Sequence, residues 1–187
     1  EKGALDWAKY SHKEFPPSDG VGDLQTFQGD LRAAVLSSGR HWIDIDPYGS
    51  PAPFIDSAMQ SMARSGVMEV SATDTAALTG SSKTALMRRY GARVRTDCLA
   101  HDSGMRVMLS NISRIAARHD RAIEPLLSVW DSHHLRVSFR VMKSVSSANV
   151  LEERIGWRVF APDKEEVAAS IDSGLQLSLI HISEPTR

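Results

Sequence analysis

An acidic residue, a proline, an aromatic residue and a glycine follow one another at positions 46–49, directly after the apolar stretch 41–45. A carboxylate at Asp46 can accept the N–H of an exocyclic amine on a base and later take its proton. Pro47 supplies a carbonyl with no competing N–H, and the flat face of Tyr48 suits stacking on a base. Gly49 lets the backbone pass close to a ligand. These residue types indicate group transfer to a base amine, although such tripeptides also occur in ordinary turns.

Two further acidic residues follow predicted strands. Asp30 comes after the short strand expected over 24–27, and Asp74 comes after the strand expected over 67–72. Open α/β sheets bind ligands at the carboxyl ends of their strands, so both side chains are candidates for a binding site. Each has a plainer interpretation, because Asp30 could cap a helix that begins at Leu31 and Asp74 could cap a turn.

The elements that would position these residues follow from hydrophobic periodicity and from glycine and proline. A strand over 41–46, a turn rich in proline and glycine, a helix over 53–64 and a strand over 67–72 form a βαβ unit, which predicts a parallel sheet covered by helices. A short link at 131–134 permits only antiparallel pairing of the two apolar segments around it. The remaining predictions are helices over 3–15, 31–38, 83–90 and 104–119, a loop over 73–82, and strands over 123–130 and 135–142.

Positive charge is concentrated in one segment of a nearly neutral chain. The formal net charge is -1, yet residues 83–121 hold nine Lys or Arg against three acidic residues. Within this segment Arg114, Arg118 and Arg121 are predicted to share one helix face, which could contact RNA phosphates or simply face solvent. For the cations nearest the predicted loop we favour contact with RNA phosphates over a solvated face, because Lys and Arg clustered beside a candidate site form the basic surface that a nucleic acid requires. These cations are Lys83, Arg88, Arg89, Arg93 and Arg95.

Composition excludes several classes of protein. A single cysteine, Cys98, excludes internal disulfides and a cysteine-rich zinc site. His133 and His134 would point to opposite faces of a strand, so no metal site is expected there. No run of about 18 uncharged apolar residues occurs, and the first residues form no apolar signal segment, so we expect a cytoplasmic, intracellular protein without a membrane span.

Five blocks of the sequence carry the most specific pattern, and together they cover roughly residues 28–143. The blocks are Ile43-Asp44-Ile45-Asp46-Pro47-Tyr48-Gly49-Ser50-Pro51-Ala52-Pro53-Phe54-Ile55-Asp56-Ser57-Ala58, Ala72-Thr73-Asp74-Thr75-Ala76 with Leu78 and Gly80, Arg89-Tyr90-Gly91-Ala92, His101-Asp102-Ser103-Gly104-Met105-Arg106, and Leu135-Arg136-Val137 with Phe139-Arg140-Val141. In order and spacing these blocks resemble the tRNA guanine-26 N2-dimethyltransferase family.

The resemblance implies a role for each candidate residue. Asp46 would be the catalytic acceptor and also lie beside the cofactor S-adenosylmethionine, with Pro47 as its backbone partner and Tyr48 packing on the target guanine of tRNA. Asp30 would contact the adenine of the cofactor. Further contacts to the tRNA substrate are expected from Gly49, Asp74, Thr75, Arg88 and Arg89.

The sequence departs from the family pattern at three positions. The usual cysteine before His101 is Ala100, the usual glutamate is Asp102, and the acidic residue that opens the last hairpin strand is Ser132. These changes weaken any role for Asp102 or Ser132 and leave the 46–49 motif intact. His101 and Arg106 match the family block, where a structural hydrogen-bond cluster at a helix start is the favoured interpretation.

The resemblance also implies a fold and a domain division. It predicts a partial Rossmann-like class I methyltransferase fold of the α/β class, with parallel strands, helices on both faces and a closing antiparallel hairpin. Residues 1–143 would be the C-terminal part of the catalytic domain, and 144–176 a linker and the truncated start of a C-terminal domain. Residues 177–187 resemble a translated sequencing adaptor.

The family's glycine-containing cofactor loop would lie upstream of Glu1, so we expect no saturable cofactor binding and no activity from this chain alone.

Two alternative functions stay open at this point. One is an amine methyltransferase acting on DNA adenine or a protein amide, disfavoured because its second proline is absent and Gly49 follows the aromatic residue. The other is a non-catalytic α/β binding module, which would leave the 43–58 run and the basic segment without a purpose.

Overall fold

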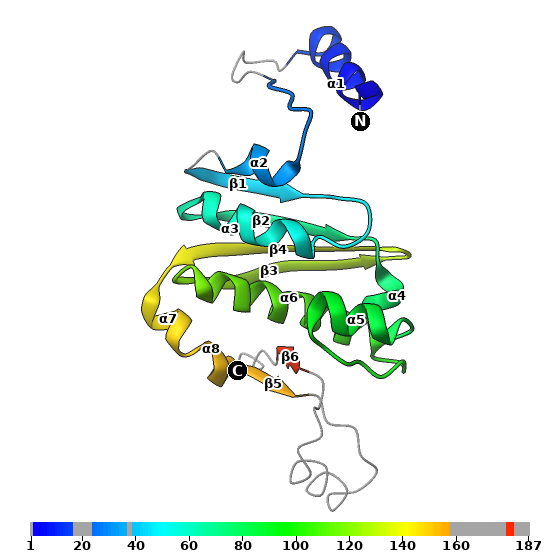
Figure 1. The fold of residues 1–187 in the computed structure, drawn as a ribbon, viewed down its shortest axis with the longest axis vertical. Helices are drawn as coiled ribbons and strands as arrows, with labels where there is room; N and C mark the ends of the chain where they lie inside the picture. Colours follow the sequence, from blue (N-terminus) through cyan, green and yellow to red (C-terminus); the bar gives the residue numbers. More distant parts are fainter. Residues whose placement is uncertain (1, 17–23, 37–38, 158–178, 182–187) are drawn as a thin grey trace, which may run out of the picture.

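The computed structural model describes residues 2–16, 24–36, 39–157 and 179–181. At its centre lies a mixed sheet of four strands, β1 (Arg40–Ile45), β2 (Met62–Ala72), β3 (Arg121–Asp131) and β4 (His134–Lys143), in the spatial order β1-β2-β4-β3 (Figure 1). β1 and β2 are parallel, whereas β4 is antiparallel to both β2 and β3. The predicted parallel pair and closing hairpin are therefore confirmed.

Helix α3 (Ala52–Ser61) makes the crossover between the two parallel strands. It begins after the turn that follows β1, where prolines occupy the first positions, and it buries Ile55, Ala58 and Met59. The helix predicted to run to residue 64 ends at Ser61, and β2 begins at once with Met62 rather than at residue 67. Met62 is buried and pairs with β1, so packing against the neighbouring strand overrides the helical pattern.

Three more helices lie with α3 over one face of the sheet, namely α4 (Thr75–Leu78), α5 (Lys83–Tyr90) and α6 (Ala100–Arg118) (Figure 1). The inward residues of β4, which are Leu135, Val137, Phe139 and Val141, are all fully buried beneath this layer. The predicted helix over 83–90 is confirmed. The predicted helix over 104–119 begins one turn earlier, and the predicted loop over 73–82 contains α4.

The opposite face of the sheet carries polar and charged side chains. Arg136 of β4 donates to Asp44 of β1 at 2.8 Å, to Ser71 of β2 at 3.0 Å and to Glu69 of β2. In the described part of the chain no helix covers this face, so the expectation of helices on both faces is wrong for these residues. The cross-strand charges let the face remain in water while they bridge three strands.

The remaining described elements lie around this core. They are α1 (Lys2–Glu14), α2 (Leu31–Val35), α7 (Val145–Asn149), α8 (Leu151–Arg154), β5 (Ile155–Trp157) and β6 (Leu179–His181). Residues 24–27, predicted as a strand, are not in a sheet, because no described strand lies beside them. The linker predicted over 144–176 contains α7, α8 and β5, and β5 pairs antiparallel with β6. Residues 158–178, like most of 177–187, lie outside the described residues.

Candidate active site

The turn that follows β1 presents the predicted acceptor residues at the carboxyl edge of the sheet. Ile43 and Ile45 of β1 are buried, which fixes the strand, and Asp46 follows with an exposed side chain. Pro47 is half-buried, whereas the ring of Tyr48 is fully exposed at 101%. No described residue donates a hydrogen bond to the Asp46 carboxylate. A carboxylate and an aromatic ring two residues apart are therefore both exposed and open to a ligand.

Two hydrogen bonds attach this turn to the end of β2. The Gly49 N–H donates to Thr73 Oγ1 at 2.7 Å, and the Thr73 N–H donates to the Gly49 carbonyl at 3.0 Å. Gly49 has φ +81°, a conformation that other residues rarely adopt, so glycine is needed for this geometry. The segments that follow the two parallel strands are thus joined at one edge of the sheet.

A second set of hydrogen bonds reaches the same turn from α5. The Tyr90 hydroxyl lies 2.9 Å from Ser50 Oγ and donates to both carboxylate oxygens of Asp74, at 2.9 and 3.1 Å. Arg89 donates to Asp74 at 3.0 Å, and the Asp74 side chain is only 7% exposed. Burial raises the pKa of Tyr90 far above its ordinary value, so its hydroxyl remains protonated. The predicted residues Asp74 and Arg89 are therefore brought together, and Thr75 follows at the start of α4.

Tyr90 and Ser50 are site residues that the sequence interpretation did not single out. Tyr90 was quoted only as part of the block 89–92, and its signal is its position as the last residue of α5, directly before the left-handed Gly91. That position turns a helix-terminal aromatic side chain inwards, where it is 6% exposed.

Asp30 caps α2, the plainer of its two predicted roles. Its carboxylate accepts the Arg32 N–H at 2.9 Å and forms an ion pair with the Arg32 guanidinium at 2.5 Å. The side-chain hydrogen bond from Arg32 lowers the Asp30 pKa to about 2. The carboxylate is exposed, so the N-cap role leaves one side of it accessible to a ligand.

The block at the start of α6 forms local contacts. Arg106 donates to Asp102 at 2.8 Å one turn away, and the His101 ring stacks on Trp130 of β3 with 4.5 Å between ring centroids. Gly104 lies beneath the Trp130 ring, where an added Cβ would be 3.0 Å from it. These contacts agree with the structural interpretation of the block.

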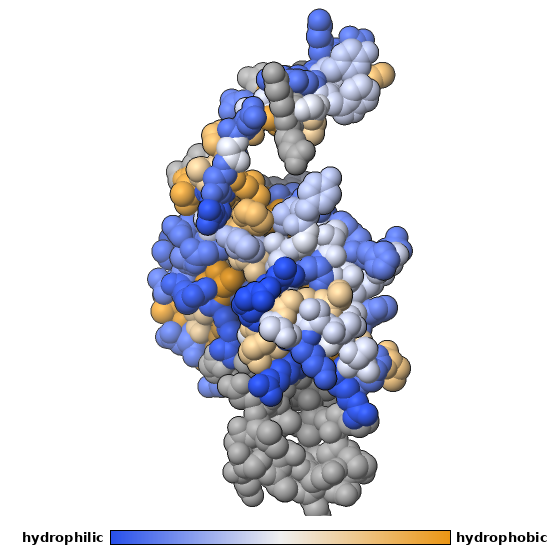
Figure 2. All heavy atoms as spheres, turned by 45° about the vertical axis from the view of Figure 1, so that its right-hand side comes forward, coloured by the Kyte–Doolittle hydropathy of each residue, from blue (hydrophilic) through white to orange (hydrophobic). Residues whose placement is uncertain are grey.

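The cations of α5 differ in their surroundings. Lys83 and Arg88 are exposed, whereas Arg89 is held by Asp74. The side of the molecule that carries α4 and α5 is turned forward in Figure 2, where hydrophilic side chains predominate. Exposed cations therefore lie on the helix that also supplies Tyr90 to the turn.

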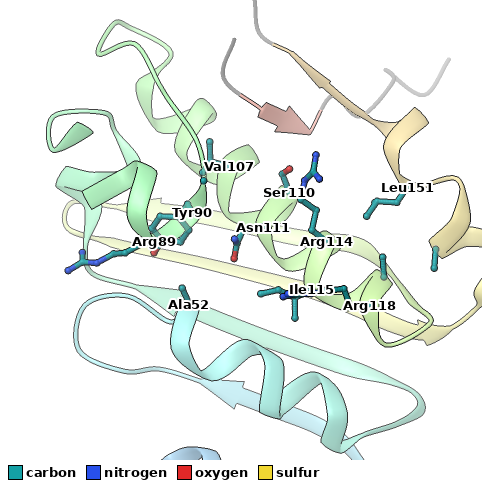
Figure 3. A pocket seen from close by; sticks show the side chains of 13 residues that line it. Ala52, Arg89, Tyr90, Val107, Ser110, Asn111, Arg114, Ile115, Arg118 and Leu151 are labelled. Carbon is teal, nitrogen blue, oxygen red and sulfur yellow. The ribbon is translucent and has the colours of Figure 1, made fainter. Parts of the chain in front are cut away.

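A groove of about 830 Å³ lies between α6 and its neighbours α3, α5, α7 and α8 (Figure 3). Tyr90 and Arg89 lie at its end near the candidate site, and Arg114 and Arg118 line it along α6. Asp46 and Tyr48 do not line it. Arg121, predicted to share the face of Arg114 and Arg118, is instead the buried first residue of β3, so that prediction is wrong.

Neither a metal cluster nor a membrane span is found among the described residues. Within them no three His, Cys, Asp or Glu side chains are grouped closely enough to hold an ion. None of the described helices combines the length and the apolar character that crossing a bilayer requires.

The fold and site together define an α/β protein whose candidate site lies where two parallel strands end, beside an antiparallel hairpin. The family model described as "N2,N2-dimethylguanosine tRNA methyltransferase" matches residues 21–165. The chain belongs to this family.

Individual relatives agree with this assignment. The tRNA (guanine(26)-N(2))-dimethyltransferase of Thermoplasma volcanium is 43% identical over 116 residues, covering 62% of this chain and 34% of the relative. The Aeropyrum pernix protein of the same name is 38% identical over 145 residues, covering 76% of this chain and 33% of the relative. The structure of Trm1 from Pyrococcus horikoshii with S-adenosyl-L-methionine matches with a TM-score of 0.73 at 26% identity, covering 96% of this chain and 49% of that chain. This chain spans about a third of the length of these curated relatives.

Proposed function

We propose that this chain carries the acceptor side of the active site of an S-adenosylmethionine-dependent enzyme that methylates the N2 amine of guanine 26 in tRNA. The observation that supports this most directly is the turn after β1, where an exposed Asp46 carboxylate and a fully exposed Tyr48 ring lie at the carboxyl edge of the sheet. The family supports the reaction type, and it favours tRNA guanine over DNA adenine, a protein amide or a non-catalytic module.

The residues of the turn can divide the reaction between them. The guanine ring stacks on Tyr48, which holds the base in place. The N2 amine donates its hydrogen atoms to the Asp46 carboxylate and the Pro47 carbonyl, which aims the nitrogen lone pair away from these acceptors. With S-adenosylmethionine bound, its methyl carbon would form the new N–C bond with this lone pair, and the electrons of the broken S–C bond would remain on sulfur. Asp46 then accepts the proton that the nitrogen loses.

The described residues offer acidic groups that fit the cofactor in part. S-adenosylmethionine supplies an electrophilic methyl group on a positively charged sulfur. The Asp46 carboxylate would lie beside this charge. Arg32 occupies much of the hydrogen-bonding capacity of the Asp30 carboxylate. Asp30 would therefore contact the adenine through the side of the carboxylate that Arg32 leaves accessible.

The substrate surface would extend from the turn onto α5. Gly49, Asp74 and Thr75 would lie around the target base, with Asp74 in a supporting role. Arg88 and Arg89 would meet tRNA phosphates, together with the nearby cations of the basic segment. Support for this comes from the hydrogen bonds that link Asp74 through Tyr90 to Ser50 of the turn, from the ion pair between Arg89 and Asp74, and from the exposure of Arg88.

The finer assignments of fold and domains belong to the same proposal. The sheet would be the part of a class I methyltransferase fold in which parallel strands are followed by the antiparallel hairpin. Residues 1–143 would belong to the catalytic domain, with the C-terminal domain beginning after residue 143. The order β1-β2-β4-β3 and the pairing directions support this proposal.

The test is a chimera in which residues 24–157 replace the matching segment of the Thermoplasma volcanium relative. Wild-type chimera should methylate a tRNA transcript with guanine at position 26 and leave a transcript with adenine there unmodified. Asp46→Ala should lower the rate by about 100-fold or more, since positioned acid–base groups contribute about that much. Asp56→Asn, on α3, is the matched control and should keep the parental rate. Full activity of Asp46→Ala would refute the acceptor assignment.

A further inference from the structure

The turn after β1 has few contacts of its own. Tyr48 points into solvent, and an added Cβ at Gly49 would meet no atom within 4 Å. The bonds between Gly49 and Thr73 hold one side of the turn. The other side is held through Ser50, whose hydroxyl meets the Tyr90 hydroxyl at 2.9 Å. The tip of the turn is therefore open, and its position depends on these two attachments.

The direction of the hydrogen bonds in this network follows from the contact between Tyr90 and Asp74. The Tyr90 hydroxyl donates to the carboxylate oxygens of Asp74, so its single proton points to Asp74. Ser50 must then donate its proton to the Tyr90 oxygen, which it meets at 2.9 Å. Arg89 adds a second donor to Asp74 and balances its charge at 3.0 Å. The hydrogen bonds thus run from Ser50 through Tyr90 to Asp74.

We propose that Tyr90 is a positioning residue that sets the acceptor turn through Ser50 and ties it to Asp74 and the basic helix α5. The inference rests on the proposed function for its catalytic consequence. Tyr90 does not touch the substrate in the proposed reaction. It fixes the Ser50 end of the segment 46–50, and thereby the angle at which Asp46 and Tyr48 meet the base.

The hydroxyl, and not the ring, carries this role. The ring is buried and a phenylalanine would fill the same volume, whereas the hydroxyl makes every polar contact of the side chain. Its loss would leave the nearly buried Asp74 with one partner fewer and release Ser50. Small displacements of a catalytic group lower rates steeply, because the reacting atoms must be aligned for transfer.

The first experiment measures the turn directly in the 187-residue chain. Amide hydrogen exchange of Gly49 and Thr73 should be about tenfold faster in Tyr90→Phe than in the parent, because the turn loses its second attachment. Tyr10→Phe, which removes an exposed hydroxyl from α1, is the matched control and should leave exchange unchanged. Unchanged exchange at Gly49 and Thr73 in Tyr90→Phe would overturn the inference.

The second experiment measures catalysis in the chimera described above. Tyr90→Phe should lower kcat about tenfold and change KM for tRNA less than twofold, because the base still binds but meets a misplaced acceptor. Ser50→Ala should lower kcat by the same factor as Tyr90→Phe, and Ser50→Thr, which keeps the hydroxyl, should have the parental kcat. The double variant Ser50→Ala/Tyr90→Phe should have a kcat no lower than that of either single variant. Additive losses of kcat in the double variant would show that Ser50 and Tyr90 act independently and would contradict the inference. A fall in kcat accompanied by faster exchange throughout the chain would show a merely structural role and would contradict it too.

The two proposals fail in different ways. If the wild-type chimera transfers no methyl group to tRNA, the proposed function fails, while the exchange comparison at Gly49 and Thr73 still decides whether Tyr90 holds the turn. If the chimera is active and Tyr90→Phe keeps the parental kcat, the proposed function stands and the role of Tyr90 is refuted.

Discussion

Replacing Arg121 by methionine should destabilise the fold without weakening RNA binding. The Arg121 guanidinium lies buried at the start of β3, where it donates to the carbonyls of Met62 at 2.5 Å and Ala63 at 2.6 Å. Pairing of β2 with β4 begins only at Ser65, so these two carbonyls lie outside that ladder. Methionine keeps the apolar stem of the side chain and removes both donors.

The expected loss follows from the two hydrogen bonds. Each hydrogen bond from a charged group contributes about 1.5 to 3 kcal/mol, and its loss leaves a carbonyl near the core without a partner. Burial lowers the pKa of Arg121, so the cost of desolvating the charge offsets part of the gain. Taking the lower figure for both bonds, the free energy of unfolding should fall by about 3 kcal/mol. For a chain of this length that corresponds to a Tm lower by roughly 6 to 12 °C.

Thermal unfolding of the 187-residue chain and tRNA binding below the transition measure the two effects separately. Arg118→Met is the matched control, because Arg118 is exposed at the end of α6 and lines the groove. Its Tm should change by less than about 2 °C, since exposed charges contribute little to stability. If Arg121→Met left the Tm unchanged and reduced tRNA affinity, the structural role assigned to Arg121 would be wrong.

Three further outcomes test the fold and the basic surface. Gly80→Ala should lower the free energy of unfolding, measured in urea, by at least ~2 kcal/mol. Gly80 has φ +81°, and an added Cβ would lie 2.5 Å from the backbone carbonyl oxygen of Val94. Gly49→Ala should lower it by only about 1 kcal/mol, because Gly49 has the same φ but open space around it. The hydrogen bond from His119 lowers the Asp56 pKa, so the parent chain should be more stable than Asp56→Asn by at most ~1 kcal/mol for this half-exposed pair. In acid titrations this difference should be fully present above the ordinary pKa of an aspartate and should disappear as the pH falls through the lowered pKa of the folded state. Arg88→Glu should weaken tRNA binding and flatten its salt dependence by about one unit or more in the logarithmic slope, and unchanged affinity at low salt would count against an RNA contact.

Much of the fold follows from local patterns in the sequence. The turn rich in proline and glycine, between two apolar segments, predicts the βαβ unit, and the short link at 131–134 predicts the antiparallel hairpin. The boundary between α3 and β2 could not be found this way, because Met62 is extended through its pairing with β1 rather than through any local preference. The strand predicted over residues 24–27 is wrong because these residues have no described neighbouring strand, and a strand-like pattern without such a neighbour does not form a sheet.

Arg121 shows a different limit of periodicity. Its spacing from Arg118 continues the helical pattern, so the sequence alone places it on the same face. The chain instead leaves the helix at Arg118 and passes through Asp120, whose φ of 56° reverses the direction of the backbone. Three residues after Arg118, Arg121 is therefore a buried donor to the backbone of β2.

Part of the candidate site could be predicted from neighbouring residues, and part of it depends on contacts between residues far apart in the sequence. Asp46, Pro47 and Tyr48 are adjacent in sequence, so their residue types alone predict an acceptor beside an aromatic ring. Tyr90 lies 40 residues from Ser50, and no pattern in the sequence says that its hydroxyl reaches that turn.

Substitutions at the end of α5 should therefore act on catalysis from a distance. The acceptor turn has a rigid base, because Ile45 and Pro51 are buried on either side of it, and an open tip at Tyr48. An open tip suits a base that must enter and leave, but it cannot define its own orientation. That orientation must come from Thr73 on one side and from Tyr90 through Ser50 on the other. A change at Tyr90 alters the geometry of methyl transfer although the side chain meets neither the tRNA nor the cofactor in the proposed reaction.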